Sequence, residues 1–189
     1  MAILIQEYAA QVNLQMAWLN TVTVHHIPNR SKRATAYHEA GHAVIHLLFG
    51  GWRVREMTIV AKSEDNYQGY CDYYIEKKLS WQQEAISFLA GPIAELLTGS
   101  VYAEGTTCDW RSSMTRVKWI MEDDGRWSED LEANDMQQSM KKVLDPLLSE
   151  TQKLVQENRE LIEAIATELI KYETLSENRI KELFQAHKQ

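Results

Sequence analysis

Five consecutive residues, His38-Glu39-Ala40-Gly41-His42, combine two imidazoles with a carboxylate at a spacing that suits a metal ion. Residues four apart on an α-helix lie on one face, so His38 and His42 can offer two ring nitrogens to one ion. Zinc accepts imidazole nitrogen at about 2.0–2.1 Å and prefers tetrahedral coordination. Glu39 lies about 100° around the helix from His38, which keeps its carboxylate off the metal but close to an activated water. The pattern predicts a hydrolytic zinc centre with Glu39 as general base.

The alternative is a helix that carries a packed histidine and an exposed pair, because short motifs also match by chance. The surroundings favour the metal. An unpaired pair of histidines would be costly among the apolar neighbours Ala40, Ala43, Val44, Ile45, Leu47 and Leu48. Gly41 lowers helix stability by about 1 kcal/mol relative to alanine. A close approach of another element over Gly41 would explain its presence in mid-helix.

A catalytic zinc site takes a third protein ligand. The extended pattern HExxHxxGxxH is excluded, because Ile45 and Leu48 stand where its glycine and third histidine would be. His46 is two turns along the helix from His38 and is interpreted as a packing or rim residue.

The acidic candidates for the third ligand are Asp109 and Glu95. Asp109 lies at the start of a predicted helix, where an aspartate can simply stabilise the helix dipole. Glu95 lies in the apolar stretch GPIAELL, where it can instead occupy an exposed position of a half-buried helix. The Cys108 thiolate is a further candidate. The residues alone leave the choice between Asp109 and Glu95 open.

The elements that must position these residues are mostly helices. Asn29 or Ser31 caps a helix that carries the motif and ends at Gly50-Gly51. Strands are expected at 53–60 and 67–75, forming a small antiparallel sheet. Ser80 and Gln83 form a capping box for a further helix, and Gly91-Pro92 should kink or break it.

The rest of the chain is also predicted to be helical. Thr106 or Thr107 caps one helix, and 122–132 is a polar connection. Asp145-Pro146 starts a long helix, with proline at its first position and an apolar stripe that reaches Leu169. A short helix covers 177–186. The fold class is mainly α with a small antiparallel β-sheet, an α+β fold.

Composition and charge narrow the class of protein. The 189 residues suffice for one domain, and the formal charge of −7 argues against nucleic-acid binding. The two cysteines make no disulfide framework, and a reduced cytoplasmic setting is expected. Residues 1–30 are expected to be an amphipathic N-terminal extension, too polar to span a membrane and without the basic start of a signal peptide. Residues 31–189 are expected to form a single zinc metallopeptidase domain.

The chain resembles the peptidase domain of the FtsH-type ATP-dependent zinc metalloproteases over about residues 31 to 186. HEAGHAV matches the motif of that family residue for residue, and the C-terminal helical pair is a strong second match. The segments that carry the resemblance are HEAGHAV, REMTIV, QGYCDY, FLAGPIAELLTG, EGTTCDW and ENRELIEAIATELIKYETLSENRIKELF.

The resemblance implies that His38, His42 and Asp109 bind Zn²⁺ and that Glu39 is the general base. It makes Glu95 a carboxylate that orients a ligand histidine. It also implies that the strand 57–60 flanks the cleft, where an extended polypeptide substrate could pair with its edge. The segments of the family that form its ATPase module and membrane spans have no match in this chain.

Two functions of different classes follow from these expectations. The first is a stand-alone zinc metallopeptidase that hydrolyses unfolded or extended polypeptides without ATP, as a possible homo-oligomer or beside a partner ATPase. The second is a regulatory or interaction protein that keeps the zinc centre but cleaves little. Glu39 separates the two in principle, since a degenerate enzyme often loses its base first, and the glutamate is present here.

Overall fold

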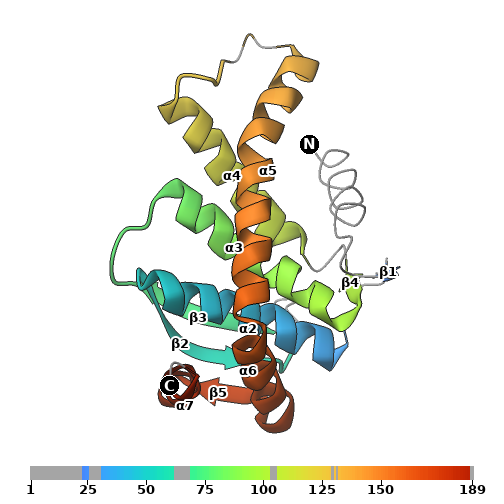
Figure 1. Cartoon of the computed structure of the whole chain (residues 1–189), viewed down its shortest axis with the longest axis vertical. Helices are drawn as coiled ribbons and strands as arrows, with labels where there is room; N and C mark the ends of the chain where they lie inside the picture. The colour runs from blue at the N-terminus through green and yellow to red at the C-terminus, as the bar shows by residue number, and fades with distance from the viewer. Residues whose placement is uncertain are drawn as a thin grey trace.

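The computed structural model describes residues 23–25, 31–61, 69–102, 106–128, 130 and 132–187. The extension predicted for residues 1–30 lies outside these ranges, apart from a short strand. The elements, in chain order, are β1 (Thr23–His25), α2 (Lys32–Phe49), β2 (Trp52–Thr58), β3 (Tyr70–Ile75), α3 (Trp81–Glu95) with a 3₁₀ turn (Leu96–Thr98), β4 (Ser100–Tyr102), α4 (Thr107–Asp123), α5 (Ala133–Glu157), α6 (Arg159–Tyr172), β5 (Thr174–Ser176) and α7 (Glu177–Ala186). This confirms a mainly α fold with a small antiparallel sheet (Figure 1).

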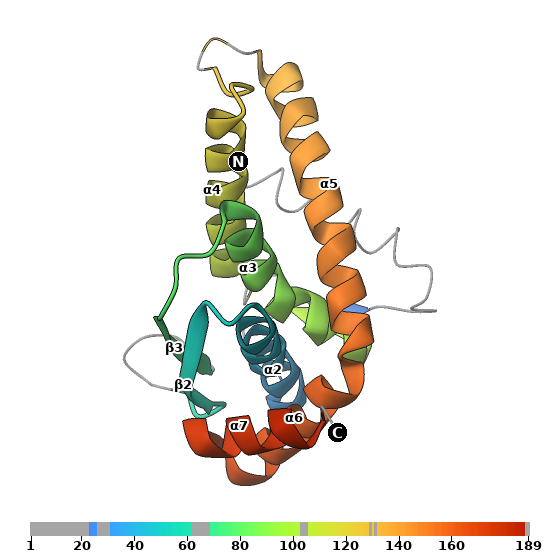
Figure 2. The same ribbon diagram turned by 60° about the vertical axis from the view of Figure 1, so that its left-hand side comes forward.

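Helix α2 is the centre of the fold. The hydroxyl of Ser31 accepts a hydrogen bond from the Ala34 amide at 3.1 Å, and Gly50 ends the helix in the left-handed conformation, as the sequence predicts. The helix packs against α3, α6 and β2, and all its residues from Ala34 to His46 are buried. Figure 2 shows β2 and β3 on one side of α2 and α6 below it. The histidine motif therefore sits in the core.

Helix α3 crosses α2 closely at Gly41. A Cβ atom on Gly41 would lie 2.5 Å from the carbonyl oxygen of Ala90 and 2.5 Å from the Cβ of Ala94. These contacts confirm the close approach that a mid-helix glycine predicted. The capping box at the start of α3 is also present, with both Ser80–Gln83 hydrogen bonds formed.

Pro92 does not break α3. The helix continues through it to Glu95, although Pro92 has no N–H to donate to the carbonyl of Phe88, one turn earlier. Pro92 and its neighbours Gly91 and Ile93 are buried. Packing on both sides of the helix therefore outweighs the loss of one backbone hydrogen bond.

The predicted start of the long helix at Asp145-Pro146 is wrong. Helix α5 already begins at Ala133, and Pro146 is an exposed residue in its interior. The helix forms earlier because apolar residues before the proline continue its buried stripe, namely Met136, Met140, Val143 and Leu144. The stripe is also divided between two helices. The chain turns at Asn158, whose side-chain amide donates a hydrogen bond to the carbonyl oxygen of Leu154 at 2.8 Å. Helix α6 begins at the next residue.

The sheet has the order β3-β2-β5, and both pairings are antiparallel. Met57 pairs with Cys71 on β3 and with Leu175 on β5. The expectation that the strand around Met57 offers its edge to a substrate is therefore wrong, because β2 has a neighbour on each side. Within the described sheet β3 is an edge strand. A separate parallel pair joins β1 to β4.

Candidate metal centre

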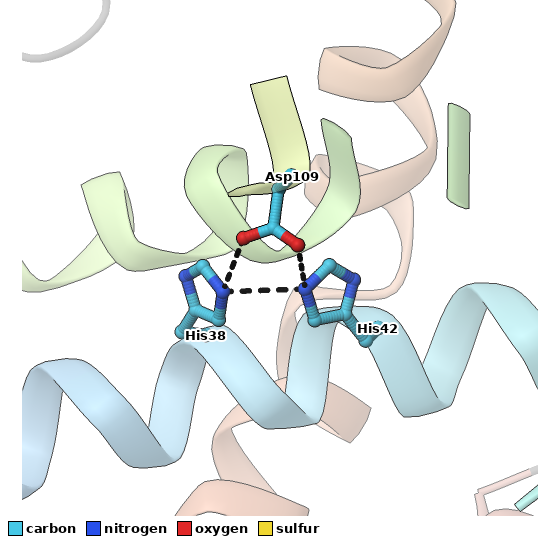
Figure 3. Close-up of side chains that lie close together, drawn as sticks. All are labelled: His38, His42 and Asp109. Carbon is cyan, nitrogen blue, oxygen red and sulfur yellow. Dashed lines mark hydrogen bonds and ion pairs between the residues drawn. The ribbon is translucent and has the colours of Figure 1, made fainter. Parts of the chain in front are cut away.

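Three side chains meet where α2 faces the first turn of α4 (Figure 3). The Nε2 atoms of His38 and His42 are 3.2 Å apart. One carboxylate oxygen of Asp109 lies 3.0 Å from His38 Nε2, and the other lies 3.5 Å from His42 Nε2. Both histidines are buried and Asp109 is partly buried. Three potential ligands from two helices thus converge on one point.

The outer nitrogens of the two rings have partners of their own. His42 Nδ1 lies 2.8 Å from the carbonyl oxygen of Ser87, which can only accept a hydrogen bond. His38 Nδ1 lies 3.1 Å from a carboxylate oxygen of Glu95, whose side chain is fully buried. We therefore assign the proton of each neutral ring to Nδ1, which leaves the lone pair of Nε2 facing Asp109. Partners of this kind orient histidine ligands in metal sites.

This set of donors fits a zinc ion. Two imidazole lone pairs and a carboxylate face one another, and only a cation or shared protons can offset their repulsion. Tetrahedral zinc with bonds of about 2.0–2.1 Å would hold two nitrogens about 3.3–3.4 Å apart, close to the observed 3.2 Å. Burial raises the pKa of the Asp109 carboxyl, but when the rings are protonated in place of a bound cation, the charge of His42 and hydrogen bonds from both rings outweigh burial and hold that pKa well below its ordinary value. Asp109 is therefore an anion at neutral pH.

Asp109 and Glu95, which the residues alone did not separate, lie on opposite sides of His38. Asp109 faces the inner nitrogens, while Glu95 lies behind the ring at Nδ1. The exposed thiol of Cys108 is not in the group of three. His46 is also outside the group and packs against Trp52 and Tyr73, with ring centroids 4.6 Å from each.

Glu39, the residue predicted to be the base, is buried. Burial is the main cause that raises the pKa of the Cys71 thiol on β3, and the charges of Glu39 and Asp72 raise it further. The charge of Glu39 therefore acts on the edge strand of the sheet.

Gly91 is a site residue that the sequence reasoning missed. A Cβ atom on Gly91 would lie 2.3 Å from His42 Nε2 and 2.8 Å from His38 Nε2. The Gly91-Pro92 pair was interpreted only as a helix breaker. The argument already applied to Gly41, that a mid-helix glycine indicates a close approach, would have identified Gly91 as well.

Comparison with known proteins gives relatives among the FtsH-type zinc metalloproteases. No protein-family model matches the chain. The FtsH 3 ATP-dependent zinc metalloprotease of Phytoplasma mali (strain AT) is 32% identical over 167 residues, which cover 80% of this chain and 27% of that protein. The FtsH protease of Aster yellows witches'-broom phytoplasma is 28% identical over 82% of this chain and 26% of its own length. The chain contains an FtsH-type protease domain.

A more distant FtsH relative supports the same assignment. The FtsH protease of Streptococcus pneumoniae serotype 4 is 23% identical over 86% of this chain and 29% of its own length. The chain thus spans little more than a quarter of the FtsH proteins that it matches. These relatives are named zinc metalloproteases, which places the FtsH-type domain in a metallopeptidase family. Within the described part of the chain, no helix combines the length and hydropathy that a membrane span requires.

Replacing Asp109 by alanine is expected to leave the protein without bound zinc after gel filtration, because one of the three inner donors is removed. Replacing Glu95 by alanine should leave zinc bound but weaken its affinity about 10–100-fold, since Glu95 contacts only the outer nitrogen of His38. Elemental analysis and titration against a competing chelator measure both effects. Cys108→Ser is the matched control, beside Asp109 but outside the group. Stoichiometric zinc in Asp109→Ala, with loss in Glu95→Ala, would show that the ligand assignment is wrong.

Proposed function

We propose that this FtsH-type domain is a zinc metallopeptidase that hydrolyses peptide bonds of unfolded or extended polypeptides, and that bond cleavage itself needs no ATP. The observation that supports the proposal is the convergence of both His Nε2 atoms with the Asp109 carboxylate on one point, beside a buried Glu39. We also propose the roles of the individual residues. His38, His42 and Asp109 hold the metal, and Glu39 is the base.

The chemistry divides between the ion and the protein. When bound, zinc supplies a Lewis acid that polarises a carbonyl and makes water more acidic. Glu39 receives the proton of the attacking water on a carboxylate oxygen and later returns it to the leaving amine. Glu95 and the Ser87 carbonyl keep the two rings turned toward Asp109 through their Nδ1 atoms.

The sheet supplies a place for the substrate. Strand β3 lies at the edge of the described sheet and carries Cys71, a thiol whose pKa is raised by burial and further by the charge of Glu39. An extended polypeptide can add to such an edge through main-chain hydrogen bonds. Folded proteins hold most of their extended segments within their own sheets, which is why we propose unfolded or extended chains as substrates.

Purified protein loaded with one equivalent of zinc is expected to cleave denatured casein without ATP. Removal of the ion with 1,10-phenanthroline should abolish cleavage, and added Zn²⁺ should restore it, because the three ligands act only through the ion. Gel electrophoresis and release of amines measure the reaction, and circular dichroism of the chelated protein controls for unfolding. If the folded, zinc-loaded protein leaves casein intact, the regulatory function becomes the better explanation.

A further inference from the structure

A short parallel strand pair lies where the segments that lead into the metal centre meet. Strand β1 runs beside β4 in register, and the opposed residues are Thr23 and Ser100, Val24 and Val101, and His25 and Tyr102. Among the residues that the structure describes, no third strand joins this pair. Figure 1 shows the pair on the side of the molecule away from the three-stranded sheet. The pair is therefore a separate connection between two distant parts of the chain.

Strand β4 connects the two carboxylates of the site. Helix α3 ends at Glu95, whose carboxylate faces the outer nitrogen of His38. A 3₁₀ turn follows, in which the Thr98 hydroxyl donates a hydrogen bond to the Glu95 carbonyl oxygen at 2.7 Å. The chain then enters β4, and helix α4 begins after it with Asp109 in its first turn. A displacement of β4 therefore reaches both acidic residues through short connections.

Strand β1 leads into the helix that carries the two histidines. The strand ends at His25, and Ser31 caps α2. Because the pairing is parallel, the two chains leave the pair in the same direction, one toward α2 and the other toward α4. Helix α2 packs mainly on α3, α6 and β2, whereas α4 packs on α3 and α5. The two helices that carry the proposed ligands are therefore joined through α3, and the strand pair adds a second connection ahead of their N-terminal ends.

The strand pair is weak by itself, which suits it to adjust the site rather than to hold the fold. Each of its strands has three residues. An isolated two-stranded pair is marginally stable in water, and parallel pairing is slightly less stable per residue than antiparallel pairing. Such a unit can open locally at a low free-energy cost while the core stays folded. When it opens, the segment that leads into α4 loses its neighbouring strand, and the hold on Asp109 weakens.

We propose that the pairing of β1 with β4 positions Asp109 against His38 and His42, so that residues 23–25 act through their backbone as positioning residues of the metal centre. The inference rests on the ligand roles that belong to the proposed function. With the pair formed, the three donors converge before an ion binds, and the ion does not have to order them. With the pair open, the cost of ordering the first turn of α4 is subtracted from the binding free energy. Strand β1 thus makes the N-terminal extension part of the metal centre.

The double variant Thr23→Pro/Val24→Pro tests the proposal in the full chain. Successive N–H groups of a strand point to opposite sides, so one of the two prolines removes a donor from the pair. We expect the affinity for zinc, measured against a competing chelator, to fall at least about 10-fold, the lower end of the effect of losing a group that orients a ligand. Thr23→Val/Val24→Ile keeps both N–H groups and favours a strand, so it should restore the affinity. Wild-type affinity in the proline variant would overturn the proposal.

A second readout needs neither metal nor turnover. Hydrogen exchange in the metal-free protein reports local opening, and amides 110–113 carry the first hydrogen bonds of α4, beginning with Trp110 to the Thr106 carbonyl. These amides should exchange at least about 10-fold faster in the proline variant, while amides 162–169 of α6 keep the wild-type rate.

The exchange rates separate the strand pair from the proposed function. If the wild type binds no zinc, the proposed function fails, and the rates of amides 110–113 still decide whether the pair holds the start of α4. Unchanged rates there would reject the proposal. Faster exchange in α6 as well would show that the pair supports the whole fold rather than the metal centre, which also contradicts it.

Discussion

Replacing Glu39 by glutamine is expected to lower the rate of peptide-bond cleavage about 10²–10⁴-fold, the usual contribution of a general base, while one zinc stays bound per chain. The amide of glutamine cannot accept the proton of the attacking water. It has nearly the volume of the carboxylate, so the buried position on α2 can hold it without repacking. His38, His42 and Asp109 are unchanged, and the affinity for zinc should therefore be retained.

Single-turnover cleavage of a casein-derived peptide and elemental analysis of the same sample measure the two effects together. Glu56→Gln is the matched control, because Glu56 is a partly buried glutamate whose carboxylate accepts a hydrogen bond from the Tyr70 hydroxyl within the sheet. The control should cleave like the wild type. Wild-type turnover in a zinc-replete Glu39→Gln protein would remove Glu39 as the base, and loss of zinc would show that its carboxylate supports the ligands instead.

The motif helix could be predicted closely because its signals are local. Ser31 caps it, Gly50 ends it, and the spacing of His38 and His42 places both rings on one face. Strand and helix types were also predictable from periodicity and caps, as at Ser80 and Gln83. Each of these signals depends on residues only a few positions apart. They needed no knowledge of which elements pack together.

The third ligand could not be chosen from the residues alone because it depends on packing. Glu95 and Asp109 both lie on helices next to α2. Only the arrangement of α3 and α4 decides that Glu95 meets the outer nitrogen of His38 and Asp109 the inner one. The resemblance to FtsH proteases predicts roles for these two residues, Asp109 as ligand and Glu95 as a carboxylate that orients a ligand histidine, and these roles stay a prediction. The wrong start of α5 has a related cause, since the apolar stripe that extends this helix before Pro146 finds its partners in other elements.

Packing makes Gly91, which the sequence suggested only as a helix breaker, part of the site. Replacing Gly91 by alanine is expected to weaken zinc binding strongly. The added Cβ would lie within 3.0 Å of the Nε2 atoms of both His38 and His42. These rings can move away only by leaving their partners, Glu95 and the Ser87 carbonyl. Loss of such an outer partner alone weakens metal affinity about 10–100-fold. Displacing two of the proposed ligands at once should weaken zinc binding by at least about 100-fold.

The fold of Gly91→Ala should remain stable, because histidine side chains can rotate and alanine favours a helix by about 1 kcal/mol over glycine. Gly41→Ala is the matched control on the facing helix. Its Cβ would meet the backbone oxygen of Ala90, which cannot rotate away, so the apo protein should lose about 1–3 kcal/mol of unfolding free energy through overpacking. Competition with a chelator gives the zinc affinity, and urea unfolding of the apo proteins gives the stability. Wild-type zinc affinity in Gly91→Ala would mean that the histidine rings do not hold the metal at the point where they converge.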